Sequence, residues 1–269
     1  MKKIEQQECR EIQMSVLDEI ARICKENNIK YSLGYGTLLG AVRHKGYIPW
    51  DDDIDICLLR EDYDKLIALL KDPTVPKKSW FTLVDDTCEG YYYSFAKAYD
   101  NRTFVDISRH KGEMGIWVDI FPLDGLPKCR CLEKPFVLYC SFLRVVGLAL
   151  SSDLNSKAYD AWTRFYKKLI YAVVSIIGKK RFCRHMERVY RRYPVNNSGR
   201  VASLFFDTKT DRVLDLDKLK EVTSFAFENR EFDGYKNYDY YLSEFYHDYM
   251  QLPPVEKRIC HDFDAWWKE

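Results

Sequence analysis

The sequence predicts an α+β protein, a mixed sheet flanked by helices with an added helical region. Three patterns carry this prediction. Apolar residues recur at helical spacing through the first ~24 residues, extended aromatic-rich runs fill the middle third, and the helical pattern returns from Glu133 to about Tyr193. No linker or repeat divides the chain, so the boundary that we place near residue 130 is soft, and a single domain is the alternative.

The elements follow in order along the chain. The N-terminal helix ends near Asn27, and a helix begins near Glu61 after a glycine-punctuated segment at 34–46. The alternation of apolar and polar residues predicts strands at 30–33, 53–58, 80–84, 91–98, 103–107 and 116–121. These strands favour a mixed or antiparallel sheet. The last helix is expected to end at Pro253 and Pro254, because proline cannot continue a helix.

Composition excludes several classes of protein. The 269 residues are 46% hydrophobic and 31% charged, as in a globular protein. The net charge of +1 provides no global field for nucleic acid or an anionic membrane, so no nucleic-acid partner is expected and phosphate recognition must be local. The charged N-terminus shows no signal or transit peptide, which predicts a cytoplasmic protein. Nine scattered cysteines are expected as reduced thiols, and Cys129 and Cys131 fit no common zinc pattern.

In the segment PWDDDIDI, residues 49–56, acidic and apolar side chains alternate from Asp53 onward. Side chains alternate between the faces of a strand, so Asp51, Asp53 and Asp55 share one face and Ile54 and Ile56 the other. Carboxylates crowded on one face repel one another, and Mg²⁺ both relieves the repulsion and leaves positions for substrate phosphates. The pattern predicts a metal site at Asp53 and Asp55. A solvated acidic face next to a turn is the alternative.

Glycines open the segment that precedes this strand, at Gly34 and Gly36, with Thr37 behind them. The spacing predicts a tight turn that begins a short helix, whose free N–H groups and positive dipole end can receive a phosphate. The segment lacks P-loop spacing and is one residue off the dinucleotide fingerprint. Glycines that only permit the turn are the other interpretation.

Residues 36–55, GTLLGAVRHKGYIPWDDDID, resemble the signature of the LicD family, which is related to fukutin-related protein. The resemblance continues at KAYDNRT (97–103), WVDIFPLDGLP (117–127) and DYMQLPPVEKR (248–258). It spans most of the chain and is weak only between about 133 and 202. His247 departs from the pattern, which has a glycine before Asp248.

This resemblance implies a nucleotidyltransferase-like catalytic core at 1–130 and a mainly helical part at 131–269 packed on it. It implies an enzyme that moves phosphocholine or a similar phospho-substituent from a CDP-activated donor, CDP-choline first, and releases CMP. The acceptor would be a hydroxyl of a cell-surface glycan such as lipopolysaccharide or teichoic acid, or of its lipid-linked precursor. The family's acidic motif falls on Asp53 and Asp55 with Asp51 beside them, and its glycine turn on Gly36 and Thr37. The expected cofactor is Mg²⁺ or Mn²⁺.

Asp119 stands in the apolar run IWVDIF, where an ionised carboxylate is costly unless it is paired or bound to metal. A neighbouring strand of the same sheet would bring it to Asp53 and Asp55, as a third metal ligand or as the base that takes the acceptor's proton. Asp51 is the other candidate for the base. A structural hydrogen-bonded role is the alternative for Asp119, and Asp124 is expected in a turn.

Cationic side chains are needed to neutralise the donor's diphosphate. Arg43, Lys97 and Arg102 are the candidates, because guanidinium and ammonium groups stabilise charge on phosphate oxygens. An ordinary surface charge is the alternative for each of them.

Aromatic residues offer a pocket for a quaternary ammonium. Tyr91, Tyr93 and Phe95 are expected on one strand face, and with Trp50 or Trp117 they can form a cation–π cage. Plain sheet packing is the alternative.

Two apolar stretches, at 136–150 and 169–177, fall short of the ~20 uninterrupted apolar residues that span a bilayer. They are expected as buried core helices or as helices on the membrane surface near a lipid-linked acceptor. The second interpretation would place a cytoplasmic protein peripherally at the inner face of the membrane.

Two other functions stay open. A true nucleotidyltransferase would attach a nucleoside monophosphate to a sugar, protein or small molecule and release pyrophosphate instead of CMP. A non-catalytic glycan-binding module would bind without turnover, and the intact set of acidic residues argues against it.

Overall fold

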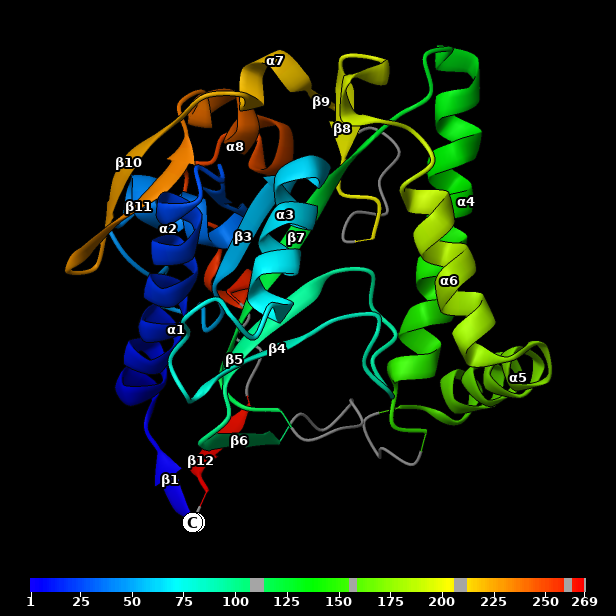
Figure 1. The fold of residues 1–269 in the computed structure, drawn as a ribbon, viewed down its shortest axis with the longest axis horizontal. Helices are drawn as coiled ribbons and strands as arrows, with labels where there is room; N and C mark the ends of the chain where they lie inside the picture. Colours follow the sequence, from blue (N-terminus) through cyan, green and yellow to red (C-terminus); the bar gives the residue numbers. More distant parts are fainter. Residues whose placement is uncertain (107–113, 155–158, 206–211, 259–262, 269) are drawn as a thin grey trace.

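The computed structural model describes residues 1–106, 114–154, 159–205, 212–258 and 263–268, and it confirms the α+β class (Figure 1). The helices are α1 Gln6–Glu26, α2 Tyr35–Arg43, α3 Arg60–Lys71, α4 Arg130–Ser151, α5 Ala161–Ile177, α6 Lys179–Tyr190, α7 Leu216–Leu219, α8 Tyr238–Tyr246 and the 3₁₀ turns η1 Val195–Asn197 and η2 Val255–Lys257. The strands are β1 Lys2–Ile4, β2 Ser32–Leu33, β3 Asp55–Leu59, β4 Phe81–Val84, β5 Ala96–Asp100, β6 Thr103–Asp106, β7 Trp117–Gly125, β8 Arg200–Ala202, β9 Leu214–Asp215, β10 Val222–Phe227, β11 Arg230–Tyr235 and β12 Asp264–Trp267.

The central sheet has the strand order β2-β3-β7-β5-β4, and β8 and β9 extend it beside the end of β7. β3 and β7 run parallel, and the other pairs are antiparallel. A hairpin of β10 and β11 forms a separate sheet next to β2, and a small sheet joins β1, β12 and β6. The C-terminal strand therefore pairs with both the N-terminal strand and the middle of the chain.

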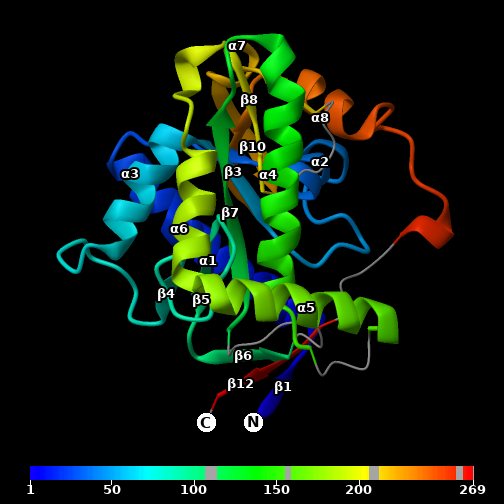
Figure 2. The ribbon, with the colours of Figure 1, turned by 90° about the vertical axis from the view of Figure 1, so that its right-hand side faces the viewer.

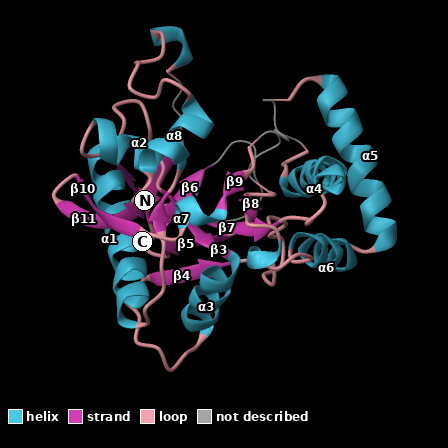
Figure 3. Ribbon diagram, turned by 90° about the horizontal axis from the view of Figure 1, so that it is seen from above, coloured by secondary structure: helices cyan, strands magenta, loops and turns pink. Residues whose placement is uncertain are grey.

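Helices cover both faces of the central sheet, as the view from above shows (Figure 3). α1 and α3 pack on one face, against β3, β5 and β7, while α2 and α8 lie on the other. α4, α5 and α6 stand together at one side of the sheet. The apolar side chains of α1 and of the inner strands are fully buried between these layers, among them Leu17, Ile20, Ile56 and Ile120.

Several boundaries differ from the prediction. β3 begins at Asp55, where the prediction began it at Asp53, and β5 begins at Ala96, where the prediction began it at Tyr91. Ile107, expected in a strand, lies outside the described residues. The last α-helix ends at Tyr246, well before the prolines, because His247 has φ 56° and ψ −111°. This left-handed region favours glycine, so the one departure from the family pattern falls where the backbone would suit the expected residue.

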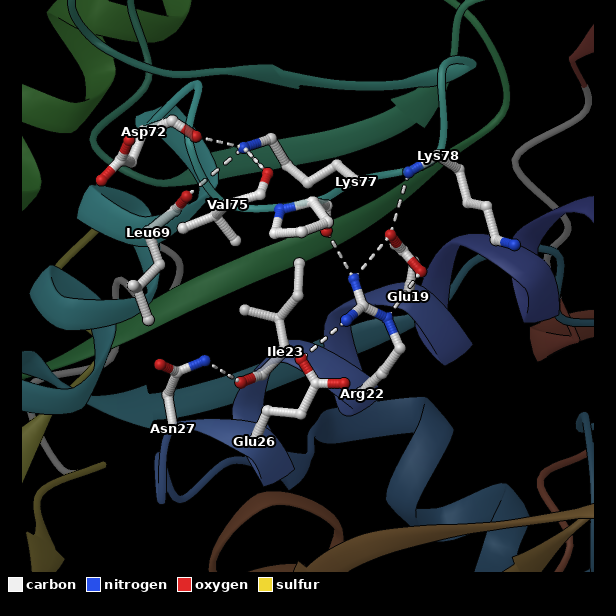
Figure 4. A network of polar contacts seen from close by, with 11 residues as sticks. Glu19, Arg22, Ile23, Glu26, Asn27, Leu69, Asp72, Val75, Lys77 and Lys78 are labelled. Atoms are coloured by element: carbon white, nitrogen blue, oxygen red, sulfur yellow. Dashed lines mark hydrogen bonds and ion pairs between the residues drawn. The ribbon is translucent and has the colours of Figure 1, made fainter.

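A buried carboxylate ties α1 to the loop that leads into β4 (Figure 4). Glu19, only 5% exposed, accepts hydrogen bonds from Nε and Nη2 of Arg22 at 3.1 and 2.9 Å and from the Lys78 N–H at 3.0 Å. Nη2 of Arg22 also donates to the carbonyl of Pro76 at 2.7 Å. Burial opposes ionisation of Glu19, but the bonds from Arg22 and Lys78 outweigh it and lower the pKa of this carboxyl.

Glu19→Gln is expected to lower the free energy of unfolding at pH 7 by about 1–3 kcal/mol, because a neutral amide replaces a buried acceptor of three hydrogen bonds. Since the folded pKa lies below the unfolded value of about 4.3, the stabilisation is complete above that pH and is lost as pH falls through the folded pKa. Urea unfolding at several pH values measures it. Glu26→Gln, which removes the exposed partner of Arg22, is the control and should cost under about 0.5 kcal/mol. A Glu19→Gln loss that is equal at pH 7 and pH 3 would contradict this account.

Candidate active site

Three charged side chains form one row across neighbouring strands. In the parallel register of β3 and β7, Asp55 lies opposite Asp119, and in the antiparallel register of β7 and β5, Asp119 lies opposite Lys97. Register partners point to the same face of a sheet. Nζ of Lys97 donates to Oδ1 of Asp119, and Nε1 of Trp117 donates to Oδ2 at 3.0 Å. The sheet therefore brings the predicted Asp119 beside Asp55.

The row lies on the face that α2 and α8 cover. Two residues further along the strands, Cys57 and Phe121 occupy the next paired position on the same face. Sγ of Cys57 is 3.7 Å from the Tyr241 hydroxyl of α8, and the Phe121 ring packs edge-on against Tyr35 of α2 at 5.5 Å. An apolar layer thus closes one side of the charged row.

The loop before β3 holds three more carboxylates, and the charges of Asp51 and Asp53 act on Asp55. Asp51, Asp52 and Asp53 each offer an oxygen, and these oxygens lie within 4.8 Å of one another. Because the strand begins only at Asp55, the expected alternation of Asp51, Asp53 and Asp55 along one strand face is wrong for the first two. Asp51 and Asp53 are half-buried, whereas Asp55 and Asp119 are buried.

The start of α2 positions this acidic loop. The Asp55 N–H donates to Oγ1 of Thr37 at 2.9 Å, and the Gly34 N–H donates to the Asp55 carbonyl at 2.8 Å. A methyl group at Gly36 would lie 2.6 Å from Oδ2 of Asp51, so the Asp51 carboxylate rests against the first turn of the helix, at its positive end. Gly36 and Thr37 therefore lie at the site, where Gly36 lies against the Asp51 carboxylate and Thr37 holds the backbone of Asp55.

The carboxylates strongly affect one another. Burial raises the pKa of Asp55 well above its ordinary value, the charges of Asp53, Asp119 and Asp51 raise it further, and Lys97 opposes them. Tyr246 of α8 also faces the cluster, because burial and the charges of Asp55, Asp51 and Asp53 raise the pKa of its phenol. Tyr246 could not be recognised from the sequence, because it lies in a tyrosine-rich stretch without distinctive spacing.

The predicted aromatic residues gather next to Asp119. Tyr91 and Tyr93 precede β5, and their rings lie 5.1 Å apart, with Phe95 5.3 Å from Tyr93. Burial raises the pKa of both tyrosines, and the charge of Asp119 adds to it. Nζ of Lys97 already lies 5.3 Å from the centre of the Phe95 ring and 4.7 Å from that of Trp117. The cage for a quaternary ammonium stays a prediction.

Arg43 ends α2, and the ring of the next residue, His44, lies 6.4 Å from the ring of Trp50. Arg43 donates to the carbonyl of Tyr249 at 2.7 Å and to the ring of His44 at 2.9 Å, which holds the segment after α8 against α2. The guanidinium of Arg258 stacks 4.6 Å from the centre of the Trp50 ring, next to the acidic loop. Arg258 is a cation at the edge of the site that the sequence did not single out, although it closes the last family motif.

The structure does not bring Arg102 to the row. Its guanidinium pairs with the buried Asp100, with Nε 3.0 Å from Oδ1, and lies between the rings of Trp80 and Trp267 at 5.1 and 5.5 Å. An arginine committed to one carboxylate and two indoles is well suited to hold β4, β5 and β12 together.

Asp124 is not in a turn, so that prediction is wrong. It lies within β7 and is 2% exposed. Its Oδ1 accepts a hydrogen bond from Nε of Arg60 at 2.6 Å, and its Oδ2 accepts one from Nη2 at 2.9 Å. Five positions separate it from Asp119, so the two carboxylates point to opposite faces of the sheet. Asp124 therefore belongs to the packing of α3, while Asp119 belongs to the site.

The exposed thiols of Cys129 and Cys131 lie 2.7 Å apart at the start of α4. Among the described residues, Asp51, Asp52 and Asp53 are the one group of three or more potential ligands that meets the distance requirement for a metal, so no third ligand joins these cysteines there.

Comparison with known proteins connects this geometry to a family. Residues 28–124 match the family model described as the LicD/FKTN/FKRP nucleotidyltransferase domain. The chain is 30% identical over 270 aligned residues, 97% of each chain, to the lipopolysaccharide cholinephosphotransferase LicD of Haemophilus influenzae. An uncharacterised protein of Rickettsia prowazekii is 37% identical over 94 residues, which are 34% of this chain and 30% of the relative. The matched range holds α2, the acidic loop, β3 and β7.

Asp124→Asn is expected to lower the free energy of unfolding by about 3–5 kcal/mol, because it leaves the buried Arg60 guanidinium without its counter-charge. Urea unfolding measures the loss. Asp64→Asn removes an exposed neighbour of the same guanidinium and serves as the control, with an expected loss of under about 1 kcal/mol. Equal losses in the two variants would show that the pair does not hold α3 on the sheet.

Proposed function

The chain belongs to the LicD family, and from this premise we propose that it is a LicD-type phosphotransferase. It moves phosphocholine from CDP-choline to a hydroxyl of lipopolysaccharide or a related cell-surface glycan, or of its lipid-linked precursor, and releases CMP. The observation that carries the proposal is the match, over nearly the whole of both chains, to a relative named for cholinephosphotransfer to lipopolysaccharide. The converging carboxylates support it with a site suited to phosphoryl transfer.

The donor atoms of the site suit Mg²⁺ or Mn²⁺, which prefer carboxylate oxygens. Asp55 is buried beside the like charges of Asp53 and Asp119, a crowding that a divalent cation would relieve. Asp53, Asp55 and Asp119 are the residues that would hold the ion, with Asp51 next to them. Bound there, the metal would supply charge stabilisation to the phosphate oxygens of the donor.

The chain's own groups prepare the site before any substrate arrives. Lys97 and Trp117 each hold one oxygen of Asp119, so its orientation is fixed. Asp51, half-buried against the first turn of α2, is the more accessible of the two candidates for the general base. Arg258 and Arg43 place positive charge at the rim near Trp50, where the donor's diphosphate would be attracted.

A nucleotidyltransferase reaction is the second candidate, favoured by the description of the matching family model. The two reactions differ in the bond that is cleaved. Attack on the phosphorus that bears choline releases CMP, whereas attack on the α-phosphorus of a nucleoside triphosphate releases pyrophosphate. Product identity therefore separates them.

With Mg²⁺ or Mn²⁺ and a lipopolysaccharide acceptor, CDP-choline is expected to yield CMP, and CDP-ribitol, CDP-glycerol and nucleoside triphosphates should react more slowly. Asp53→Asn and Asp55→Asn should each lower kcat at least ~100-fold, because the lost carboxylates act most strongly in the transition state. Both variants should fold, since each substitution removes repulsion among like charges.

Chromatography of the nucleotide products measures this reaction. Asp217→Asn, a change of the same kind at an exposed position on α7, is the matched control and should retain the wild-type rate. Pyrophosphate release with every CDP-alcohol inert would assign the second reaction. Glycan binding without any nucleotide product would leave a binding module.

A further inference from the structure

Helix α5 presents an apolar stripe to solvent. Trp162, Phe165, Leu169, Val173 and Ile176 recur at three- and four-residue spacing, with exposures that range from 48% for Val173 to 73% for Trp162 and 88% for Ile176. Within α5 only Val174 is fully buried. We call these five residues the α5 stripe. A soluble surface rarely groups so many large apolar side chains unless they contact a partner or a membrane.

α5 lies on the outside of the molecule. Figure 2 shows it crossing in front of α4 and α6, and Figure 3 shows it at the outer edge, farthest from the sheet. α4 carries a second exposed apolar row, Leu138, Phe142 and Val145. α4 as a whole is long and apolar enough to cross a membrane by length and composition, with a mean hydropathy of 1.4 over 18 residues. However, 44% of that window is buried inside the protein.

Charge is strongly segregated along the chain. Residues 128–193, which carry α4, α5 and α6, hold fifteen Lys and Arg and four Asp and Glu, a net charge of +11, although the whole chain carries +1. We call this segment the helical lobe. Lys168 on α5 and Lys180 and Arg181 at the start of α6 are exposed beside the α5 stripe. In the part of the chain that the structure describes, no carboxylate forms an ion pair with these three.

We propose that the helical lobe docks the protein on an anionic phospholipid bilayer. The α5 stripe enters the boundary between headgroups and acyl chains, and the basic side chains around it contact the lipid phosphates. An interfacial helix requires this combination of an apolar face rich in Trp, Phe and Leu with flanking Lys and Arg. The net charge of the whole chain argued against attraction to an anionic membrane. Because the positive charge is concentrated in the helical lobe, that argument does not hold for this face.

The lobe adjoins the candidate active site. The Tyr91–Phe95 segment lies near Asp119, and the Tyr92 carbonyl within it would be 3.0 Å from a methyl group at Gly147 of α4. Lys179, at the start of α6, lies 6.0 Å from the centre of the Tyr92 ring. The lobe that carries α5 is therefore joined through α4 and α6 to the aromatic segment beside the carboxylate row. The inference does not depend on the reaction, because its test measures binding alone.

Co-sedimentation of the full chain with vesicles tests the proposal. Vesicles of phosphatidylglycerol and phosphatidylcholine should bind the protein, and pure phosphatidylcholine should bind it at least ~10-fold more weakly. The double variant Phe165→Ser, Ile176→Ser should lose ~10-fold or more in partitioning, and its exposed positions allow it to fold. The triple variant Lys168→Glu, Lys180→Glu, Arg181→Glu should lose as much, as should the wild type in 0.5 M NaCl.

Two matched controls keep the test specific. Met250→Ser, Val255→Ser removes exposed apolar side chains outside the lobe, and Lys25→Glu, Lys65→Glu, Lys236→Glu makes the same change in net charge on other elements. Both should bind within twofold of the wild type. Binding that survives the stripe double variant, or that is equal on both kinds of vesicle, would overturn the proposal. Absence of vesicle binding would also overturn it. If light scattering then showed a dimer that the double variant Phe165→Ser, Ile176→Ser dissociates, the stripe would be assigned to a second copy of this chain.

Discussion

The parallel register of β3 and β7 is the constraint on which the site depends. It places Asp55 opposite Asp119, and the antiparallel register of β5 then adds Lys97 to the same row. A slip of one residue would turn Asp119 to the face of α1 and α3 and bring an apolar neighbour into the site. The long apolar stretches of both strands resist such a slip, because Ile56, Val118 and Ile120 would lose their buried positions. The fold's core thus fixes the chemistry of its charged row.

The two faces of β7 carry carboxylates in different roles, one in packing and one in the candidate site. On one face both oxygens of Asp124 accept hydrogen bonds from Arg60, a buried pair that holds α3 in place. On the other face, burial and the charges of the neighbouring carboxylates raise the pKa of Asp55 and disfavour its ionised form, and Lys97 opposes them only in part. Such uncompensated charge costs folding free energy and is typical of a site that awaits a cation. α2, α8 and the segment held by Arg43 surround this charge, while the helical lobe stands outside and contacts it through the aromatic segment before β5.

Much of this arrangement could be predicted from local pattern. Helical periodicity located α1 and α3, the glycines located the start of α2, and an acidic residue in an apolar run identified Asp119 as a residue with a partner. Long-range pairing could not be predicted, because side-chain alternation shows which face a residue takes and not which strand lies beside it. The sequence therefore missed the pairing of Arg60 with Asp124, the stacking of Arg258 on Trp50, and the commitment of Arg102 to Asp100. Summed composition also concealed the basic lobe, since the rest of the chain is acidic enough to offset it.

The central claim is that Asp119 completes a divalent-metal site, and Mn²⁺ titration of two β7 variants tests it most directly. Isothermal calorimetry would compare the wild type with Asp119→Asn and with Asp124→Asn, in conditions where circular dichroism shows each to be folded. These substitutions change buried carboxylates on the same strand, on opposite faces of the sheet. The account predicts that Asp119→Asn weakens Mn²⁺ binding about tenfold or more, while Asp124→Asn keeps the wild-type affinity. Unchanged affinity in Asp119→Asn, or an equal loss in both variants, would contradict it.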